Sequence, residues 1–292
     1  MKRLFTKSTF YFVFVMVCLP AFSHGQGHKK FLGIGASYGF TNYLGDLDDN
    51  FTFRFIEYGV GVHVQRSLHE RWQVRATLYH GYMEAADKDA KFTTNYKRNL
   101  SFRTNLDEVS LQALFRFLKT QKGFQLRNTL TPYVFAGIAY YHFNPQAQTD
   151  DGVWHDLEPL GTEGQHLEGN YPSPYSLWQM SVPFGGGFFI KLSYSFDLAF
   201  EMGLRKTFTD YLDDVSTNYP DLTKLREEMG ETAYELSYRG NKNGVVDSDI
   251  SHKHRGNSGS DDWYAYTNVG ITYYFGIGNH KGLRGFFRDE GQ

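Results

Sequence analysis

The amino-acid sequence predicts an all-β fold: an eight-stranded antiparallel up-and-down transmembrane β-barrel with long extracellular loops. Three observations predict this class: an N-terminal export signal, about eight segments of alternating hydrophobicity, and connections that alternate between short and long. Aromatic residues make up 17% of the 292 residues, and 30 residues are glycine. Beyond the N-terminal segment, no stretch approaches the roughly 20 apolar residues of a membrane-spanning helix. This composition fits strands whose two faces meet different solvents.

The first 25 residues have the order of a secretory signal peptide. A basic start precedes an unbroken apolar run at residues 10–19, and small residues surround a cleavage point before Gln26. The run is too short to span a bilayer as a helix, and a buried N-terminal helix is the less favoured interpretation. Cys18, the single cysteine, lies inside this run. We therefore expect a signal peptide over residues 1–25 and a mature chain without disulfides, thiolate metal sites or cysteine catalysis.

Alternation of apolar and polar residues is the main signal for strands. It is sharpest where Phe196, Leu198 and Phe200 alternate with Asp197 and Glu201. A strand needs this pattern when one face meets lipid and the other a polar lumen. The fifth segment is apolar on both faces and is the least clear of the set. The predicted strands are residues 31–40, 54–66, 71–82, 107–118, 131–143, 176–192, 194–209 and 263–275.

Connection lengths give an independent indication of a barrel. The links at residues 67–70, 119–130 and around 193 are short or moderate, whereas those at 41–53, 83–104, 144–175 and 210–262 are long. With the N-terminus in the periplasm, every long link falls outside the cell, as in outer-membrane barrels. A soluble β-sandwich also alternates, but its loops do not sort in this way. We expect the barrel over residues 26–278 and a periplasmic C-terminal tail over 279–292.

An eight-stranded barrel has an interior just wide enough for its own side chains. Charged residues on the inward faces should therefore pair, because an unpaired buried charge is costly. An ion or proton path through the lumen is the alternative, but the mixed signs favour a plug over a path or a diffusion porin. The predicted plug residues are Glu57, Arg75, Glu108, Arg116, Glu201 and Arg205.

The external loops carry two candidate metal sites. Asp210, Asp213 and Asp214, together with acids at positions 46, 48 and 49, offer oxygen ligands for Ca²⁺. Neither run has EF-hand spacing, so carboxylates that are solvated or cap turns are favoured. His252 and His254 form a pair only two residues apart, which is a weak metal signal. The sequence predicts no resident metal and no cofactor.

The sequence gives little support for catalysis or for nucleic-acid binding. Serine, histidine and aspartate are all present in the loops, but no G-x-S-x-G elbow accompanies them. A net charge of −2 and the lack of a basic domain argue against nucleic acid. The longest loop has Pro220 at one end and Gly230 at the other end of a stretch with helical signals, which predicts a short surface helix over 220–230. Residues 232–239 are open to an alternative, a β-hairpin extension above the membrane.

Several segments together resemble the PorG-like outer-membrane barrel family, which includes a component of the type IX secretion system. The resemblance covers nearly the whole mature chain and rests on residues 41–47 (TNYLGDL), 133–145 (YVFAGIAYYHFNP), 160–165 (LGTEGQ), 182–187 (VPFGGG) and 207–217 (TFTDYLDDVST). It implies a non-enzymatic barrel among outer-membrane lipids. It also implies a contact with the lipoprotein of a periplasmic secretion ring, which the barrel would help to anchor.

The segment after the last predicted strand is a candidate contact surface. It combines basic and aromatic side chains, which suit docking to a partner protein, although a disordered end is the equal alternative. The candidate residues are Lys281, Arg284, Phe286, Phe287 and Arg288. The sequence thus predicts an assembly or anchoring component of secretion. The alternatives are a surface barrel whose loops bind a ligand, a neighbouring cell or Ca²⁺, and a barrel enzyme that modifies lipids or peptides.

Overall fold

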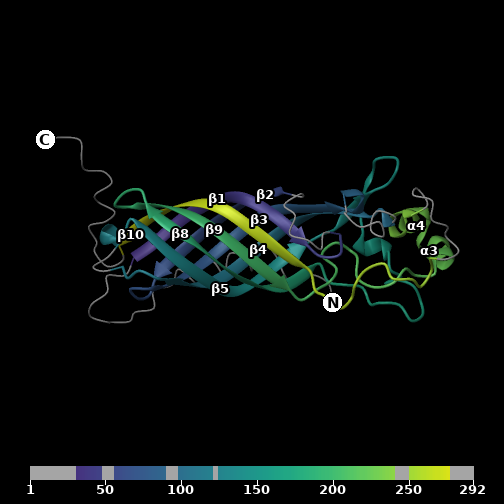
Figure 1. The fold of residues 1–292 in the computed structure, drawn as a ribbon. Helices are drawn as coiled ribbons and strands as arrows, with labels where there is room; N and C mark the ends of the chain where they lie inside the picture. Colours follow the sequence, from purple (N-terminus) through teal and green to yellow (C-terminus); the bar gives the residue numbers. More distant parts are fainter. Residues whose placement is uncertain (1–30, 48–55, 90–97, 121–123, 241–249, 277–292) are drawn as a thin grey trace.

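Eight long strands close into a single antiparallel barrel in the computed structural model, which describes residues 31–47, 56–89, 98–120, 124–240 and 250–276 (Figure 1). Each strand pairs with its neighbours along the chain, and the last strand pairs with the first from Leu44↔Trp263 to Phe31↔Gly276. The predicted eight-stranded antiparallel barrel is therefore confirmed. The barrel strands are β1 (Phe31–Leu44), β2 (Glu57–Ser67), β3 (Trp72–Ala86), β4 (Ser101–Arg116), β5 (Leu130–Phe143), β8 (Trp178–Lys191), β9 (Phe196–Thr207) and β10 (Trp263–Gly276).

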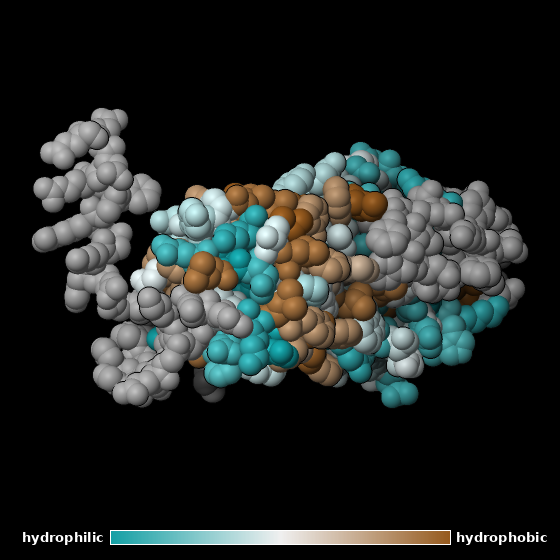
Figure 2. All heavy atoms as spheres, turned by 60° about the vertical axis from the view of Figure 1, so that its left-hand side comes forward, coloured by the Kyte–Doolittle hydropathy of each residue, from teal (hydrophilic) through white to brown (hydrophobic). Residues whose placement is uncertain are grey.

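The outward faces of the strands are apolar. On β9 the side chain of Phe200 is 44% exposed, whereas the next residue, Glu201, is 7% exposed. This is the reverse of a soluble protein and matches the lipid-facing band of an outer-membrane-type barrel. On the face that Figure 2 shows, apolar residues form a brown band across the middle of the barrel, next to more hydrophilic regions toward its ends. No helix in the described part of the chain is long and apolar enough to cross a membrane.

The two ends of the barrel differ. The connections β2–β3, β4–β5 and β8–β9 meet at one end, here called the turn end, and the four long connections meet at the other, the loop end (Figure 1). A 3₁₀ turn, η2 (Phe124–Leu126), lies at the turn end. The loop end carries η1 (Asp87–Asp89), a small hairpin of β6 (Gln146–Gln148) and β7 (Trp154–Asp156), η3 (Glu158–Leu160), α3 (Leu222–Met229) and α4 (Glu231–Ser237).

β3 and β4 extend beyond their predicted ends toward the loop end. Their pairing continues as far as Ala86↔Ser101, whereas the sequence predicted ends at residues 82 and 107. The extension keeps an apolar inner face, because Met83, Ala85 and Phe102 remain buried under the loops. The strands therefore rise above the lipid-facing band, where hydrophobic alternation against lipid no longer marks them.

The helix predicted over 220–230 is confirmed as α3. Asp221 caps it by accepting hydrogen bonds from the backbone N–H groups of Thr223 (3.0 Å) and Lys224 (3.1 Å). The hairpin extension considered for 232–239 is wrong, because α4 occupies this stretch. Ala233 and Leu236 are buried three residues apart, and this spacing buries one helix face rather than one strand face.

Candidate functional site

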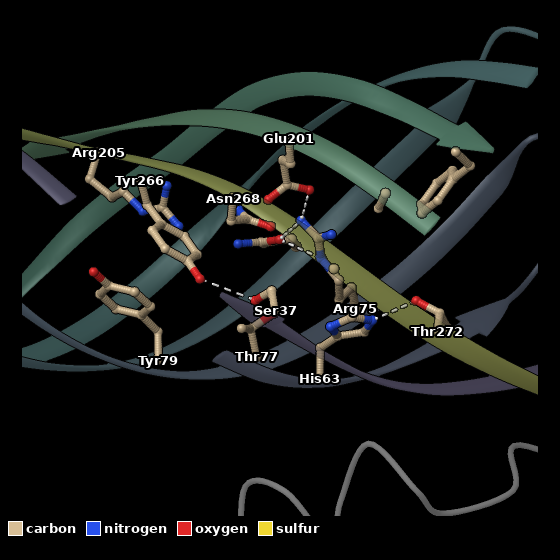
Figure 3. A pocket seen from close by; sticks show the side chains of 14 residues that line it. Ser37, His63, Arg75, Thr77, Tyr79, Glu201, Arg205, Tyr266, Asn268 and Thr272 are labelled. Atoms are coloured by element: carbon tan, nitrogen blue, oxygen red, sulfur yellow. Dashed lines mark hydrogen bonds and ion pairs between the residues drawn. The ribbon is translucent and has the colours of Figure 1, made fainter. Parts of the chain in front are cut away.

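An ion pair crosses the centre of the lumen. The Nη2 atom of Arg75 on β3 lies 2.6 Å from Oε2 of Glu201 on β9, and both side chains are buried (Figure 3). Tyr133 on β5 donates its hydroxyl to Glu201 (2.7 Å), and Arg75 donates two N–H groups to Oε1 of Gln112 on β4 (2.9 and 2.6 Å). Because every charge in this group has a partner, the lumen can hold it without a large desolvation penalty. The group ties four strands together across the lumen.

A second ion pair lies nearer the loop end. Arg205 on β9 faces Glu108 on β4, with 3.4 Å between Nε and Oε2, and Tyr264 donates its hydroxyl to the same carboxylate oxygen (2.7 Å). Arg75, Glu201 and Arg205 line a cavity of about 20 Å³, together with His63 and Tyr266 (Figure 3). A space of this size holds about one water molecule. At this level the lumen is filled by its own side chains.

The connection between β4 and β5 closes the turn end. Arg127 follows η2, and its fully buried side chain points into the barrel. Its Nη2 atom lies 2.7 Å from Oδ1 of Asp197, and its Nε atom lies 3.0 Å from Oδ2. The guanidinium lies 4.3 Å from the centre of the Tyr274 ring, and the ring of Phe124 packs 6.2 Å from that of Phe31. A two-point ion pair stacked on an aromatic ring holds its geometry well. The turn end is therefore blocked by a fixed side chain.

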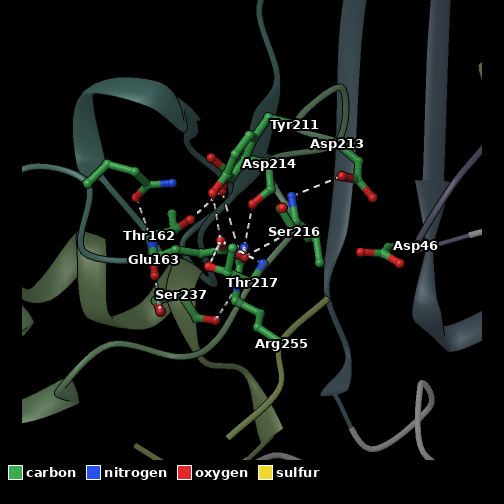
Figure 4. Close-up of polar contacts among 12 residues, drawn as sticks. Asp46, Thr162, Glu163, Tyr211, Asp213, Asp214, Ser216, Thr217, Ser237 and Arg255 are labelled. Atoms are coloured by element: carbon green, nitrogen blue, oxygen red, sulfur yellow. Dashed lines mark hydrogen bonds and ion pairs between the residues drawn. The ribbon is translucent and has the colours of Figure 1, made fainter. Parts of the chain in front are cut away.

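A buried polar network joins the loops at the opposite end (Figure 4). Glu163, which is fully buried, accepts hydrogen bonds from the backbone N–H groups of Ser216 and Thr217 (both 2.9 Å) and pairs with Nη1 of Arg255 at 3.0 Å. Asp214 pairs with Nη2 of the same arginine at 3.4 Å. We call this network the loop cap; its members come from residues 160–165, 209–217 and 255. It joins three segments that are distant in the sequence into one unit.

The three acids proposed for Ca²⁺ have different partners. Asp213 accepts from the Tyr43 hydroxyl (2.6 Å) and Asp214 from the Tyr175 hydroxyl (2.7 Å), while Asp210 lies apart from both contacts. Burial raises the pKa of Asp210 to about 8, that of Asp214 to about 6 against the opposing effect of Arg255, and that of Asp213 well above its usual range. No three His, Cys, Asp or Glu side chains among the described residues are arranged to hold a metal ion.

The other predicted residues lie in different places. Glu57 is the first residue of β2, opposite Thr41 at the loop end, and is not part of the two lumen pairs. Arg116 is buried toward the turn end, 5.1 Å from the Phe189 ring, and its Nε and Nη1 atoms have no hydrogen-bond partner in the described structure. The acids at 48 and 49, the signal peptide over 1–25 and the tail over 279–292 with Lys281, Arg284, Phe286, Phe287 and Arg288 lie outside the described residues.

Sequence reasoning missed the residues that close the two ends. Arg127 lies in a connection without alternation, so no strand pattern indicated that it points inward. Glu163 and Arg255 are about 90 positions apart and pair only because the loops fold back over the barrel. One local feature of the sequence could have indicated a buried loop acid: Glu163 is a single charged residue in the glycine-containing segment Leu-Gly-Thr-Glu-Gly-Gln.

The sequence matches one family model. Residues 7–158 match the model of a family described as Domain of unknown function (DUF6089). None of the curated proteins matches this sequence.

The similar solved structures include three outer-membrane proteins. The attachment invasion locus protein Ail of Yersinia pestis is 8% identical, with 85% of this chain and 100% of that chain covered and a TM-score of 0.40. The N-terminal β-barrel domain of Pseudomonas aeruginosa OprF is 14% identical, with 86% and 100% covered and a TM-score of 0.35. A major outer membrane protein of Thermus thermophilus is 15% identical, with 85% and 100% covered and a TM-score of 0.39.

Proposed function

Because the chain belongs to the family described as Domain of unknown function (DUF6089) and folds as a barrel filled by its own side chains, we propose that it is a non-enzymatic anchoring or assembly component of a protein secretion machine in the bacterial outer membrane. The observation that carries this proposal is the closure of the lumen at three levels: Arg127 at the turn end, the two central ion pairs, and the loop cap. A barrel that is closed in this way offers its surfaces, rather than a channel, to its partners.

The proposed direction of the barrel in the membrane rests on the difference between its two ends. Short turns face the periplasm and long loops face the outside in outer-membrane barrels, so the turn end is the periplasmic one in this proposal. Gly276 ends β10 at the turn end, where it pairs with Phe31. The chain beyond it, residues 279–292, then starts on the periplasmic side, where a ring-forming partner would be reached.

The resemblance to the PorG-like family supplies the specific form of the proposal. The machine is the type IX secretion system, and the partner is the lipoprotein of its periplasmic ring. Aromatic side chains and arginines are the residues that most often dominate protein interfaces. Phe286, Phe287, Arg284 and Arg288 would therefore anchor the contact, with Lys281 at its edge.

A pull-down from outer membranes in mild detergent tests the proposal. The tagged full chain is compared with a chain that ends at residue 278, and the recovered proteins are identified by mass spectrometry. We expect a periplasmic ring lipoprotein with the full chain and its loss on truncation. Recovery with both chains would keep the role and move the contact to the periplasmic turns, whereas a barrel recovered alone in both forms would overturn the proposal.

Two matched variants of the full chain separate the two kinds of contact. One replaces Phe286 and Phe287 by alanine, and the other replaces Lys281, Arg284 and Arg288 by glutamine. We expect the aromatic variant to lose the partner at all salt concentrations. The charge variant should weaken recovery mainly at low salt, because exposed ion pairs are screened as salt rises.

A further inference from the structure

A second candidate site lies at the loop end, on the side of the barrel where β3 and β4 extend. The structure has a cavity of about 470 Å³ there. It is lined by residues of the extended strands, of the β6–β7 hairpin and of the chain that follows α4. The volume is in the range of pockets that take small ligands. The residues that matter for the argument are Glu84, Lys88, Ser101, Asp150, Trp154 and Arg239.

Arg239, which lines the cavity, is a cation with unused hydrogen-bonding capacity. Its side chain is only 13% exposed, yet its contacts are long: 3.5 Å from Nη1 to Ser101 Oγ and 3.4 Å from Nη2 to Asp150 Oδ1. Its Nε atom has no hydrogen-bond partner within the described residues. Good N–H···O bonds are about 2.7–3.2 Å long. The guanidinium of Arg239 can therefore donate shorter hydrogen bonds to a better-placed acceptor. Burial also lowers the pKa of Arg239, which means that nearby acids compensate its charge incompletely.

Trp154 gives the same cavity an aromatic wall that is already held in place. The guanidinium of Arg103 lies 3.4 Å from the centre of the indole ring, and Arg103 is in turn hydrogen-bonded to Gln146 on the hairpin (3.3 Å). The Trp154 side chain is still 39% exposed and lines the cavity. Aromatic faces carry partial negative charge and attract the weakly positive C–H bonds of a sugar ring. An indole fixed by stacking loses little freedom when such a ring binds.

We propose that this cavity binds a carboxylate-bearing sugar residue of a polysaccharide. The carboxylate meets Arg239, with the exposed Lys88 at the rim adding positive charge, and the sugar ring lies against Trp154. Asp150 and Glu84 accept hydrogen bonds from sugar hydroxyls. A simple inorganic anion would use the cation but not the indole. A neutral sugar would leave the guanidinium of Arg239 with only its long contacts to Ser101 and Asp150. This site is at the opposite end of the barrel from the proposed secretion contact and does not depend on it.

Calorimetric titration of the detergent-solubilised full chain tests the site. The probes are an oligogalacturonide and, as the neutral control, a malto-oligosaccharide of equal length. We expect the acidic probe to bind about tenfold more tightly than the neutral one, because one charge-assisted hydrogen-bonded contact is gained. Equal binding of the two probes, or binding of neither, would overturn the proposal.

Variants then place the binding in this cavity. Arg239→Gln should weaken the acidic probe about tenfold. Arg226→Gln, which removes an exposed arginine of α3 that pairs with Glu231, is the matched control and should leave binding unchanged. Because Arg239 is largely buried, Lys88→Gln at the exposed rim is a second variant that keeps the fold, and it should weaken binding about threefold. Equal effects of the Arg239 and Arg226 variants would contradict the proposed site.

Mass spectrometry of the purified protein distinguishes the possible sources of the sugar. The ligand is a polysaccharide of the same cell surface if freshly extracted wild-type protein carries an acidic glycan and the Arg239→Gln variant does not. The ligand comes from outside the cell if the wild-type protein carries no glycan but binds added oligogalacturonide.

Discussion

At the scale of single residues, the Arg75–Glu201 pair is a fully partnered buried ion pair at the centre of the lumen. Replacing Glu201 by glutamine keeps the shape but leaves the guanidinium of Arg75 buried beside a neutral amide. Breaking a buried pair in this way costs about 3 kcal/mol or more, so we expect the free energy of unfolding to fall by that amount. Denaturant titration in detergent micelles, followed by tryptophan fluorescence, measures it.

The double variant Arg75→Gln/Glu201→Gln is the control for this prediction. Removing both charges avoids the uncompensated cation, so the double variant should be more stable than Glu201→Gln alone. Losses that simply add would show that the two side chains do not interact in the folded barrel.

The lumen residues also show what the sequence can predict at this scale. Alternation indicates which side chains point inward, so Arg75, Glu108, Glu201 and Arg205 were predictable as lumen residues. Alternation does not indicate which of them pair, because partners on non-adjacent strands depend on the tilt and stagger with which the barrel closes. Arg127 was not predictable even as an inward residue, since it lies outside any strand.

At the scale of elements, the loop cap should respond to pH through Asp210. Burial is the main cause that raises its pKa to about 8, and the charges of Asp46, Glu163 and Asp261 add to it. A carboxyl whose pKa is raised on folding favours the fold most below its unfolded pKa, about 4, and this contribution is lost as pH rises through the folded pKa. We therefore expect the 209–217 segment to open more readily as pH rises from about 4 to about 8.

Hydrogen exchange of the 209–217 amides, corrected for the intrinsic pH dependence of exchange, measures this opening. Asp210→Asn removes the titrating group and should flatten the response, while Glu228→Gln on the exposed face of α3 should not change it. An unchanged pH response in Asp210→Asn would assign the effect to other acids of the cap.

Elements were predictable where one face of a segment meets a uniform environment. β9 alternates cleanly because lipid lies on one side and the lumen on the other. α3 was indicated by Pro220 before it and Gly230 after it. The extensions of β3 and β4 and the helix α4 were not predicted, because their outer sides do not meet lipid: Glu84 and Arg103 on the extensions and Glu231 on α4 are exposed, and only the opposite side of each element is covered by protein. Their residues Ala85, Phe102 and Leu236 are buried by loops that are distant in the sequence.

At the scale of the whole molecule, strand number and the sorting of loop lengths were the predictable features. Both follow from the membrane, which imposes an apolar outer face and separates two kinds of connection. The closure of the lumen was predictable only in principle, from the narrow interior of eight strands. Which groups close each end depends on contacts such as Glu163–Arg255 that join remote segments.

This closure predicts the electrical behaviour of the protein in a planar lipid bilayer. The parent protein should show no stepwise conductance, because the lumen is blocked at the turn end, at the two central ion pairs and at the loop cap. Arg127→Ala removes only the block at the turn end, so it should remain non-conducting. Steps of constant size from the parent protein would contradict a filled lumen, while steps seen only with Arg127→Ala would mean that the turn end alone holds the barrel closed.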